Sequence, residues 1–555
     1  MPGGFFSLFA AKKAFCIDTL NPYHTRQKKK WIGLMAEKRY SLIKKESNID
    51  NEKRRSPSFY TIIFFSLLFL FTLCRIWIGS RVPLGADEAY IWEWSRHPAL
   101  CYYDHPPLTA WIVRFFTWIS ATKTTVRLVG PLSFAGFSFI LWKFTKKLYS
   151  SSATAMLAGL LPSTIPLFAV GGIITSVEGP FILTWILTLF FFHSAIIKKK
   201  PIAWYLTGIA IGLGMMSKYL MILFLPAAFF FLLFSKQHRP LLRTKEPWLA
   251  LLLAFILFIP AIIWNANHHW ANFALNFTNR GSPNPISPQV SSFLLFFATQ
   301  AAVITPLFFI GIIVLIATFL STKKEKNEDS FFLLMMSLPI FIFFLFFSAI
   351  GKTAAHWPAI GYIALFPPLA HAIVSSSFTT QWKRTLFLAG TLFAFFITLI
   401  LHTAILFPNT TARLLPSKQR ARFLFFMGPW QKKLATHIAS LQEELGGTNN
   451  TFLMCRGFSL ASYIAFSHPL QPEVYAIFQQ PGLGRGYSYW QDFTRVLGKD
   501  CIFIEEGGRE STTARLTKAF DTIEKMDDIT FIEEGIPMMR IALWKCSHFK
   551  GLRDA

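Results

Sequence analysis

The sequence predicts an α-helical membrane protein that crosses the bilayer many times. Its 555 residues are 53% hydrophobic and 17% aromatic, and only 15% are charged, against about 25% in a typical soluble chain. Apolar runs recur along the chain, and a run of about 18 residues is long enough to cross the hydrocarbon core. A β-barrel would alternate polar and apolar residues, and these runs do not.

The apolar runs divide into about eleven expected spans, with an upper count of about 13 because the stretch 152–235 can be divided in more than one way. The expected spans are 59–78, 126–144, 152–170, 176–196, 202–217, 219–235, 247–264, 292–319, 331–350, 357–375 and 385–406.

The distribution of basic residues predicts the orientation. The formal net charge is +26, and Lys and Arg gather in the N-terminal tail and in alternate short loops, as expected of loops on the cytoplasmic side. This pattern favours membrane topology and lipid headgroups over nucleic acid as the reason for the charge. The basic loops contain Lys143, Lys146 and Lys147; Lys198, Lys199 and Lys200; Lys236, Arg239, Arg243 and Lys245; Lys323, Lys324 and Lys326; and Lys383 and Arg384.

We therefore expect a multi-pass membrane protein with a cytoplasmic N-terminus and a C-terminal domain on the outer, periplasm-like side. Three parts are expected: a disordered basic tail over 1–57, a membrane domain over 58–407 and a soluble α/β domain over 408–555, where short apolar runs alternate with helix-like segments.

Six cysteines show no CxxC pair and no metal-binding spacing. Cys455, Cys501 and Cys546 lie in the C-terminal domain, where an oxidising compartment permits a disulfide and would leave one thiol over.

The long outer loop 80–125 is the densest chemical feature of the chain. Within it, the stretch 84–111 mixes carboxylates, histidines, a Pro-Pro pair and many Trp and Tyr side chains. Its segments 87–97 and 107–119 are expected to form short interfacial helices. The stretch is interpreted either as a catalytic loop or as a solvent-exposed loop that connects two membrane helices.

The predicted topology places most of the unusual polar residues on the outer face. Ionisable side chains beside membrane spans are costly and often functional. This outer group comprises Asp87, Glu88, Asp104, His105, Glu178, Lys218, His268, His269, Arg280, Lys352 and His356.

Each group also has a structural alternative. Asp87 and Glu88 suit a helix cap, and Asp104 and His105 suit a turn before a helix with Pro in its first turn. Lys218 suits a snorkelling anchor, and the two adjacent histidines suit polar filler at the interface. None of these alternatives explains why all the residues share one face.

Together these residue types suit group transfer from a lipid-linked phosphate. A carboxylate can remove the proton of an acceptor hydroxyl, and carboxylates with a histidine can hold a divalent cation such as Mg²⁺, Mn²⁺ or Zn²⁺. Isolated cations, here Lys218, Arg280 and Lys352, suit a phosphate. No Walker loop, Rossmann fingerprint or G-x-S-x-G elbow is present in the sequence, so we expect no nucleotide cofactor.

The same segments carry a family resemblance. GADEAYIWEWSRHPALCYYDHPPLTAW, ITSVEGPF, GLGMMSKY, IPAIIWNANHHWANF and KTAAHWPA follow one another in the chain. In content and order they resemble the C-type membrane glycosyltransferases, in particular the bacterial group related to dolichyl-phosphate-mannose-protein mannosyltransferases and the lipid A aminoarabinose transferase. The resemblance covers about 58–375.

The resemblance implies a role for several of these residues. Asp87 matches the loop acid that activates the acceptor, with Glu88 beside it as a second catalytic candidate. Asp104 and His105 match the pair before Pro-Pro, placed near the metal and the donor phosphate. Lys218 matches a donor-phosphate contact.

Arg280 and Lys352 are assigned with His105 and Lys218 to the donor phosphate. Glu178, His269 and His356 are candidates for the acceptor or a metal. Glu178 stands where the family pattern has Asp, and His105 where the aminoarabinose transferase has Lys, so the Asp104–His105 pair is assigned either to a metal or to the phosphate.

The sequence thus predicts a glycosyltransferase that moves a sugar from a polyprenyl-phosphate carrier to a lipid A, glycan or protein acceptor on the periplasmic face. Membrane lipids are expected partners and nucleic acid is not. The alternative is a transporter or flippase of lipid-linked sugars, which would place its polar residues at mid-membrane depth on broken helices.

Overall fold

The computed structural model describes residues 56–279, 290–321, 328–350, 353–375, 380–477, 484–507, 516–533 and 535–552. The chain divides into two units, Met1–Tyr60 and Thr61–Ala555, and the candidate site lies in the second. The predicted tail 1–57 falls almost entirely outside the described residues.

Six helical segments of the described chain are long and apolar enough to cross a membrane. They are α3 (Pro57–Arg81), α6 and α7 (Lys123–Arg127 and Val129–Tyr149), α10 (Glu178–Ile196), α13 (Glu246–Asn267), α17 and α18 (Glu328–Met335 and Leu338–Ile350) and α21 (Gln381–Leu406). A seventh candidate is the pair α15 (Val290–Ile304) and α16 (Pro306–Ser321), whose described parts meet at 111°. The protein is therefore a polytopic helical membrane protein.

The other expected spans are shorter or broken helices. Prolines cause two of the breaks, because a proline lacks the N–H that continues a helix and clashes with the preceding turn. Pro162 and Pro166 open new helical segments after α8, and Pro367 opens α20. The segments are α8 (Ser152–Leu160), η1 (Leu161–Thr164), α9 (Pro166–Gly171), α11 (Ile202–Ser217), η2 (Tyr219–Leu223), α12 (Phe224–Phe234), η3 (Arg239–Arg243), α19 (Ala359–Ile363) and α20 (Phe366–Val374).

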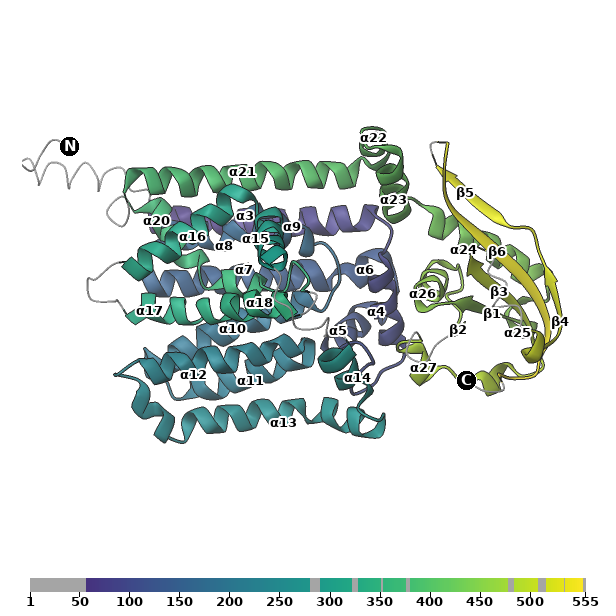
Figure 1. The fold of residues 1–555 in the computed structure, drawn as a ribbon, viewed down its shortest axis with the longest axis horizontal. Coiled ribbons are helices and arrows are strands. Elements are labelled where there is room, and N and C mark those ends of the chain that lie inside the picture. The colour runs from purple at the N-terminus through teal and green to yellow at the C-terminus, as the bar shows by residue number, and fades with distance from the viewer. Residues whose placement is uncertain are drawn as a thin grey trace, which may run out of the picture. The chain divides into compact units, whose positions relative to one another are not determined.

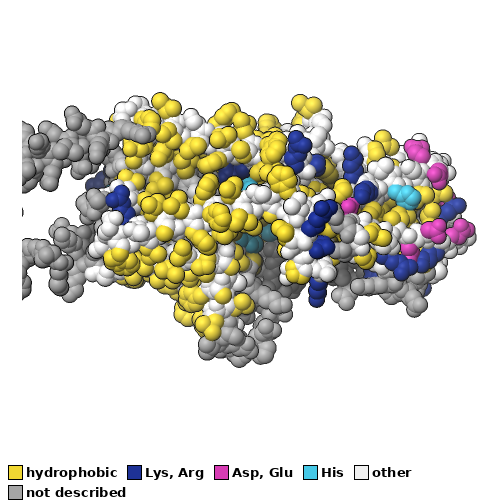
Figure 2. Space-filling model, turned by 90° about the horizontal axis from the view of Figure 1, so that it is seen from above, with side chains coloured by type: hydrophobic (Ala, Val, Ile, Leu, Met, Phe, Trp, Pro, Cys, Tyr) yellow, Lys and Arg dark blue, Asp and Glu magenta, His cyan; other side chains and the backbone are white. Residues whose placement is uncertain are grey.

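The surface of the helix bundle is apolar, as a lipid-facing surface must be. Large side chains such as Phe69, Phe255 and Phe396 are exposed on α3, α13 and α21. Figure 2 shows hydrophobic side chains spread over the bundle, with charged side chains gathered toward the end that carries the C-terminal part.

The predicted short helices of the outer loop are present as α4 (Ala86–Arg96) and α5 (Leu108–Thr117). Figure 1 shows α4, α5 and the short helix α14 (Ala271–Ala274) at the end of the bundle nearest the sheet. The π-helical turn η4 (Leu275–Asn279) follows α14 in the chain.

The C-terminal part is an α/β fold built on a six-stranded sheet. Its order is β2-β1-β3-β6-β4, with β5 paired to β6; β1 is parallel to β2 and β3, and β6 is antiparallel to β3, β4 and β5. The strands are β1 (Thr451–Arg456), β2 (Val474–Ile477), β3 (Asp500–Glu506), β4 (Phe520–Lys525), β5 (Ile529–Glu533) and β6 (Ile536–Phe549). The helices are α22 (Pro408–Arg413), α23 (Ser417–Met427), α24 (Trp430–Glu444), α25 (Gly447–Asn450), α26 (Phe458–Ser467), α27 (Tyr487–Trp490) and η5 (Phe493–Val496).

One predicted helix of this part is wrong in its second half. The sequence pattern indicates a helix over 513–524, whereas Phe520–Lys525 forms β4 and pairs with β6. Tertiary pairing with the long β6 decides the conformation here and overrides the local helical pattern. Residues 508–515 lie outside the description.

The five cysteines in the described chain are free thiols. Cys501 and Cys546 face each other in register across β3 and β6, and both are buried. Burial raises the pKa of the Cys546 thiol to about 12.

One apolar core joins the outer loop to the C-terminal part. Tyr90 and Trp94 of α4 share a buried cluster with Trp430, Tyr487 and the inner residues of β1 and β3. The Tyr90 ring lies 4.8 Å from that of Phe458 on α26. This core fixes α4 against the sheet domain and thereby orients the acidic residues of the loop.

Candidate active site

A cavity of about 850 Å³ opens where the outer loop meets the membrane helices. Its acidic and basic lining comes from distant segments: the start of α4, the 104–105 turn, the start of α10, the end of α11 and the segment before α19. Six of the residues singled out in the sequence line it together with Arg485 of the C-terminal part. Those six are Asp87, Asp104, His105, Glu178, Lys218 and His356.

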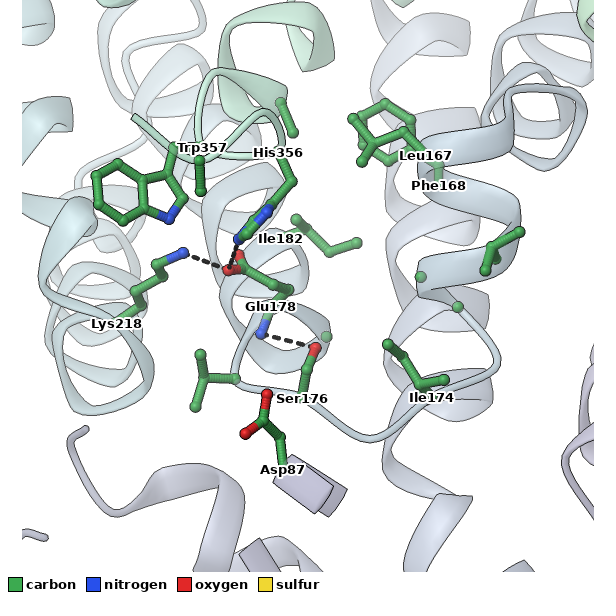
Figure 3. Close-up of a pocket in the computed structure, with 18 of the residues that line it drawn as sticks. Asp87, Leu167, Phe168, Ile174, Ser176, Glu178, Ile182, Lys218, His356 and Trp357 are labelled. Carbon is green, nitrogen blue, oxygen red and sulfur yellow. Dashed lines mark hydrogen bonds and ion pairs between the residues drawn. The ribbon is translucent and has the colours of Figure 1, made fainter. Parts of the chain in front are cut away.

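Asp87 lies in the first turn of α4, where the helix dipole favours a negative charge. Figure 3 shows its carboxylate directed toward the space below Glu178 and Ser176. In the part of the chain that the structure describes, no side chain forms an ion pair or a hydrogen bond with this carboxylate. Asp87 is therefore available to a ligand in the cavity.

Glu88, the second predicted catalytic acid, does not line the cavity and is only 4% exposed. Arg127 donates to both of its oxygens, from Nε to Oε1 at 2.7 Å and from the terminal nitrogen to Oε2 at 2.5 Å. The backbone N–H groups of Gly85 and Thr175 donate to the same carboxylate, each at 2.9 Å. Glu88 thus caps α4 and forms a buried ion pair, an arrangement that gives the predicted catalytic role no support.

Asp104 lies 3% exposed at the cavity wall. The Tyr90 hydroxyl donates to one carboxylate oxygen at 2.8 Å, and the Arg485 guanidinium lies 3.2 Å from the other. Burial, with a smaller contribution from Asp104, raises the pKa of Tyr90 well above its ordinary value, so the phenol stays a hydrogen-bond donor. Asp104 is an ordered part of the cavity, held by two partners. Asp104, Tyr90 and Arg485 thus form one polar cluster of the cavity.

Glu178, Lys218 and His356 form a second polar cluster (Figure 3). Glu178 begins α10, and its Oε1 pairs with the Lys218 ammonium group and lies 3.1 Å from His356 Nε2. The Lys218 side chain is 8% exposed, and its ammonium group lies 5.8 Å from the ring centres of Phe181 and Trp357. The lysine, carboxylate and histidine therefore fix one another at the edge of the cavity.

The remaining predicted residues divide into three groups. His105 lines the cavity, with its ring 6.2 Å from that of Trp94. His269 is exposed in the turn after α13, outside the residues that line the cavity. Arg280 and Lys352 lie outside the described residues.

Asp104 and His105, as arranged, do not fit a divalent cation. The carboxylate is already bound by Tyr90 and by a guanidinium, whose positive charge opposes a metal ion. Among the described residues, no group of three His, Cys, Asp or Glu side chains is suited to hold a metal.

Two cavity residues, Tyr90 and Arg485, were not predicted. Tyr90 follows Asp87 by three positions, so helical spacing places both on one face of α4, and the sequence contained this signal. No local pattern links Arg485 to the outer loop, because its approach depends on the fold of the C-terminal part.

Comparison of the sequence with known proteins finds similarity to membrane glycosyltransferases. Residues 104–264 match the family described as dolichyl-phosphate-mannose-protein mannosyltransferase. A lipid A galacturonosyltransferase of Rhizobium johnstonii is 24% identical over 317 residues, which is 53% of this chain and 62% of that protein.

A second relative is an undecaprenyl phosphate-α-4-amino-4-deoxy-L-arabinose arabinosyl transferase of Pectobacterium atrosepticum, 29% identical over 184 residues. That match covers 30% of this chain and 32% of the relative. The chain thus spans less than two thirds of the length of both curated relatives.

The solved structure of ArnT from Cupriavidus metallidurans bound to undecaprenyl phosphate shares the fold. The TM-score is 0.58 at 12% sequence identity, and the match covers 88% of this chain and 98% of that one. Residues 104–264 thus match that mannosyltransferase family, and the fold of the whole chain is similar to that of the ArnT structure.

Proposed function

We propose that this protein transfers a sugar from a polyprenyl-phosphate carrier to a hydroxyl group of an acceptor, with Asp87 as the general base. One observation carries the proposal: among the described residues, Asp87 faces the cavity without a side-chain partner, whereas Glu88, Asp104 and Glu178 are all paired. A general base must be free to reach the proton that it removes.

In the proposed reaction, the Asp87 carboxylate accepts the proton of the acceptor hydroxyl. The acceptor oxygen forms a bond to the anomeric carbon as the bond from that carbon to the phosphate oxygen breaks. The electron pair of the broken bond leaves with the polyprenyl phosphate. Cations near the leaving oxygens stabilise this charge, and they act more strongly in a cavity that excludes water.

Lys218 is the proposed contact for the leaving phosphate. Its ammonium group has three donor hydrogens, and Glu178 and the rings of Phe181 and Trp357 hold it in place. His105 also lines the cavity and is proposed as a second phosphate contact. Arg280 and Lys352 stay predictions for the same role.

The apolar part of the cavity suits the lipid carrier. Phe134, Leu167, Phe168, Ile174 and Ile182 line it beside the polar clusters, and such side chains bind hydrocarbon by burying it from water. A site that offers acids and cations next to an apolar wall matches a substrate with a charged phosphate and a long prenyl chain.

The relatives indicate the class of substrate. One is named as a lipid A galacturonosyltransferase and the other as a transferase that uses undecaprenyl phosphate-linked aminoarabinose. By similarity we propose an undecaprenyl-type donor and lipid A as the acceptor, with glycan and protein acceptors as the other members of the predicted set. Both hexosyl and pentosyl groups occur among these relatives' sugars.

The proposed location is the bacterial inner membrane, with about eleven spans, a cytoplasmic N-terminus and a periplasmic C-terminal part. The alternating basic loops support this orientation. The shorter helices α11 and α12 and the broken α19–α20 segment are proposed to cross the membrane together with their packed neighbours.

The experiment that tests the proposal follows a donor labelled in both the lipid and the sugar. The purified protein in nanodiscs should release free polyprenyl phosphate in step with glycosylation of added lipid A. Asp87→Asn should abolish both products while the variant inserts and unfolds like wild type. Normal turnover by Asp87→Asn would refute the base assignment, and movement of intact donor without release of polyprenyl phosphate would favour a transporter instead.

A further inference from the structure

The C-terminal part contributes one charged side chain to the cavity. Arg485 lies in the turn before α27, and its guanidinium is 3.2 Å from Asp104. The cavity is lined by this arginine and by residues of the membrane part together. The C-terminal domain thus completes the site.

The turn that carries Arg485 is tightly anchored. The Gly486 N–H donates to the Tyr90 hydroxyl at 2.5 Å, and a Cβ atom on Gly486 would overlap the Trp490 ring. Arg485 itself has a φ of 48°, a left-handed conformation that is costly for a residue with a side chain. Such a conformation persists because the surrounding contacts impose it.

The guanidinium is also oriented for recognition. It lies 4.1 Å from the ring centre of Phe458, so its plane has an aromatic support. One terminal nitrogen faces Asp104, and the side chain is 39% exposed, so other N–H donors stay open to the cavity. A planar guanidinium can hold two oxygens of a carboxylate or phosphate at once.

The two polar clusters give this arginine a distinct position. Lys218 is paired with Glu178 and is almost fully buried, whereas Arg485 is half-buried beside a carboxylate that it shares with Tyr90. Arg485 is therefore the cation of these two clusters that a large anionic ligand can reach most readily.

We propose that Arg485 is a substrate-binding residue supplied by the C-terminal domain. Its guanidinium binds two oxygens of an anionic group in the cavity. The ligand is either the phosphate of the lipid-linked donor or the carboxylate of an acidic sugar on it. Asp104 and Tyr90 position the guanidinium. This inference rests on the proposed function, because it assigns the anion to the donor.

The test measures binding and turnover separately on the full-length protein in nanodiscs. The variants are Arg485→Gln and Arg485→Lys, with Arg495→Gln as a matched control because Arg495 is 70% exposed and paired with the nearby Asp492. The probes are polyprenyl phosphate alone, a polyprenyl-phosphate hexose and a polyprenyl-phosphate hexuronic acid.

If Arg485 binds the phosphate, Arg485→Gln should weaken binding of all three probes by about tenfold or more. If it binds the sugar carboxylate, only the hexuronic acid donor should bind more weakly. Arg485→Lys should recover part of the affinity, because lysine keeps the charge but not the planar pair of donors. The control should match wild type.

The proposal is overturned if a folded Arg485→Gln protein binds all three probes within about twofold of wild type. Failure of the proposed function has a different signature: wild type would bind the probes but release no polyprenyl phosphate from either donor. Even if wild type releases no polyprenyl phosphate, weaker probe binding by Arg485→Gln than by wild type would still support the binding role of Arg485, and equal binding would still refute it.

Discussion

Glu88 and Arg127 form a buried two-pronged ion pair, although Glu88 stands directly beside the open carboxylate of Asp87 in the sequence. Arg127 also donates to the carbonyl oxygens of Gly79, Val82 and Pro83. The pair thus joins the end of α3 to the start of α4 and to the end of α6. The two adjacent acids have different surroundings because only Glu88 is paired with this arginine.

This pair should determine stability and leave the chemistry to its neighbour. Glu88→Gln and Arg127→Met should each lower the free energy of unfolding by about 3–5 kcal/mol, since each leaves a buried charge without its partner. Asp87→Asn, the matched control, should unfold like wild type but lose turnover. Thermal unfolding in detergent beside a turnover assay separates these effects, and an unchanged melting temperature for Glu88→Gln would contradict the structural role.

Lys218 and Glu178 should act as one unit. Lys218→Met and Glu178→Gln should each reduce kcat/KM, and the double variant should lose less than the sum of the two, with a coupling energy of about 1–3 kcal/mol. The reason is that the Glu178 carboxylate pairs with and orients the lysine that is proposed to contact the phosphate.

The measurement is a double-mutant cycle on donor turnover. Lys198→Met is the control because Lys198 is exposed in a basic loop, and it should leave kcat/KM unchanged. Strictly additive losses for the pair would show that the two residues contribute independently.

Glu93 should make stability depend on pH around neutrality. It is fully buried on α4, beside Arg96 at 2.9 Å and the Tyr487 hydroxyl at 3.3 Å. Burial outweighs these partners and raises the pKa of Glu93 from 4.5 to about 7, so the folded protein binds this proton more tightly than the unfolded chain.

The sign follows from linkage: a raised carboxyl pKa adds stability that is fully present below about pH 4.5 and is lost as pH rises through about 7. The full change is on the order of 3 kcal/mol. Glu93→Gln, which mimics the protonated acid, should therefore flatten the decline in melting temperature between about pH 5 and pH 8. An equally steep decline in that variant would assign the pH dependence to other groups.

The proposed orientation can be read from labelling of single cysteines. In a background with both Cys16→Ser and Cys74→Ser, Ser488→Cys, on an exposed residue of α27, should react in intact spheroplasts with a maleimide that cannot cross membranes. Lys198→Cys, in a predicted cytoplasmic loop, should react only after the membrane is opened. If Lys198→Cys reacted in intact spheroplasts and Ser488→Cys only after the membrane is opened, the predicted orientation would be wrong.

The sequence by itself determined the class of protein and the region of the site. Long apolar runs require membrane helices, since hydrocarbon leaves no other partner for the backbone polar groups. The alternating basic loops alone assign Asp87, Asp104, Glu178, Lys218 and His356 to one face of the membrane. In the folded chain these five residues line one cavity.

Local patterns also predicted the short helices α4 and α5 and the α/β character of the C-terminal part. They failed at β4, where pairing with β6 overrides the helical pattern, and at the broken spans, where prolines divide apolar runs that composition treats as continuous.

Only the tertiary structure decided which acid is free. The partner of Glu88 lies 39 residues away, and that of Glu178 lies 40 residues away. Arg485 approaches Asp104 from the far end of the chain. A carboxylate's role depends on the charges and donors that surround it in space, and no spacing rule along the chain encodes contacts made by the packing of one domain against another.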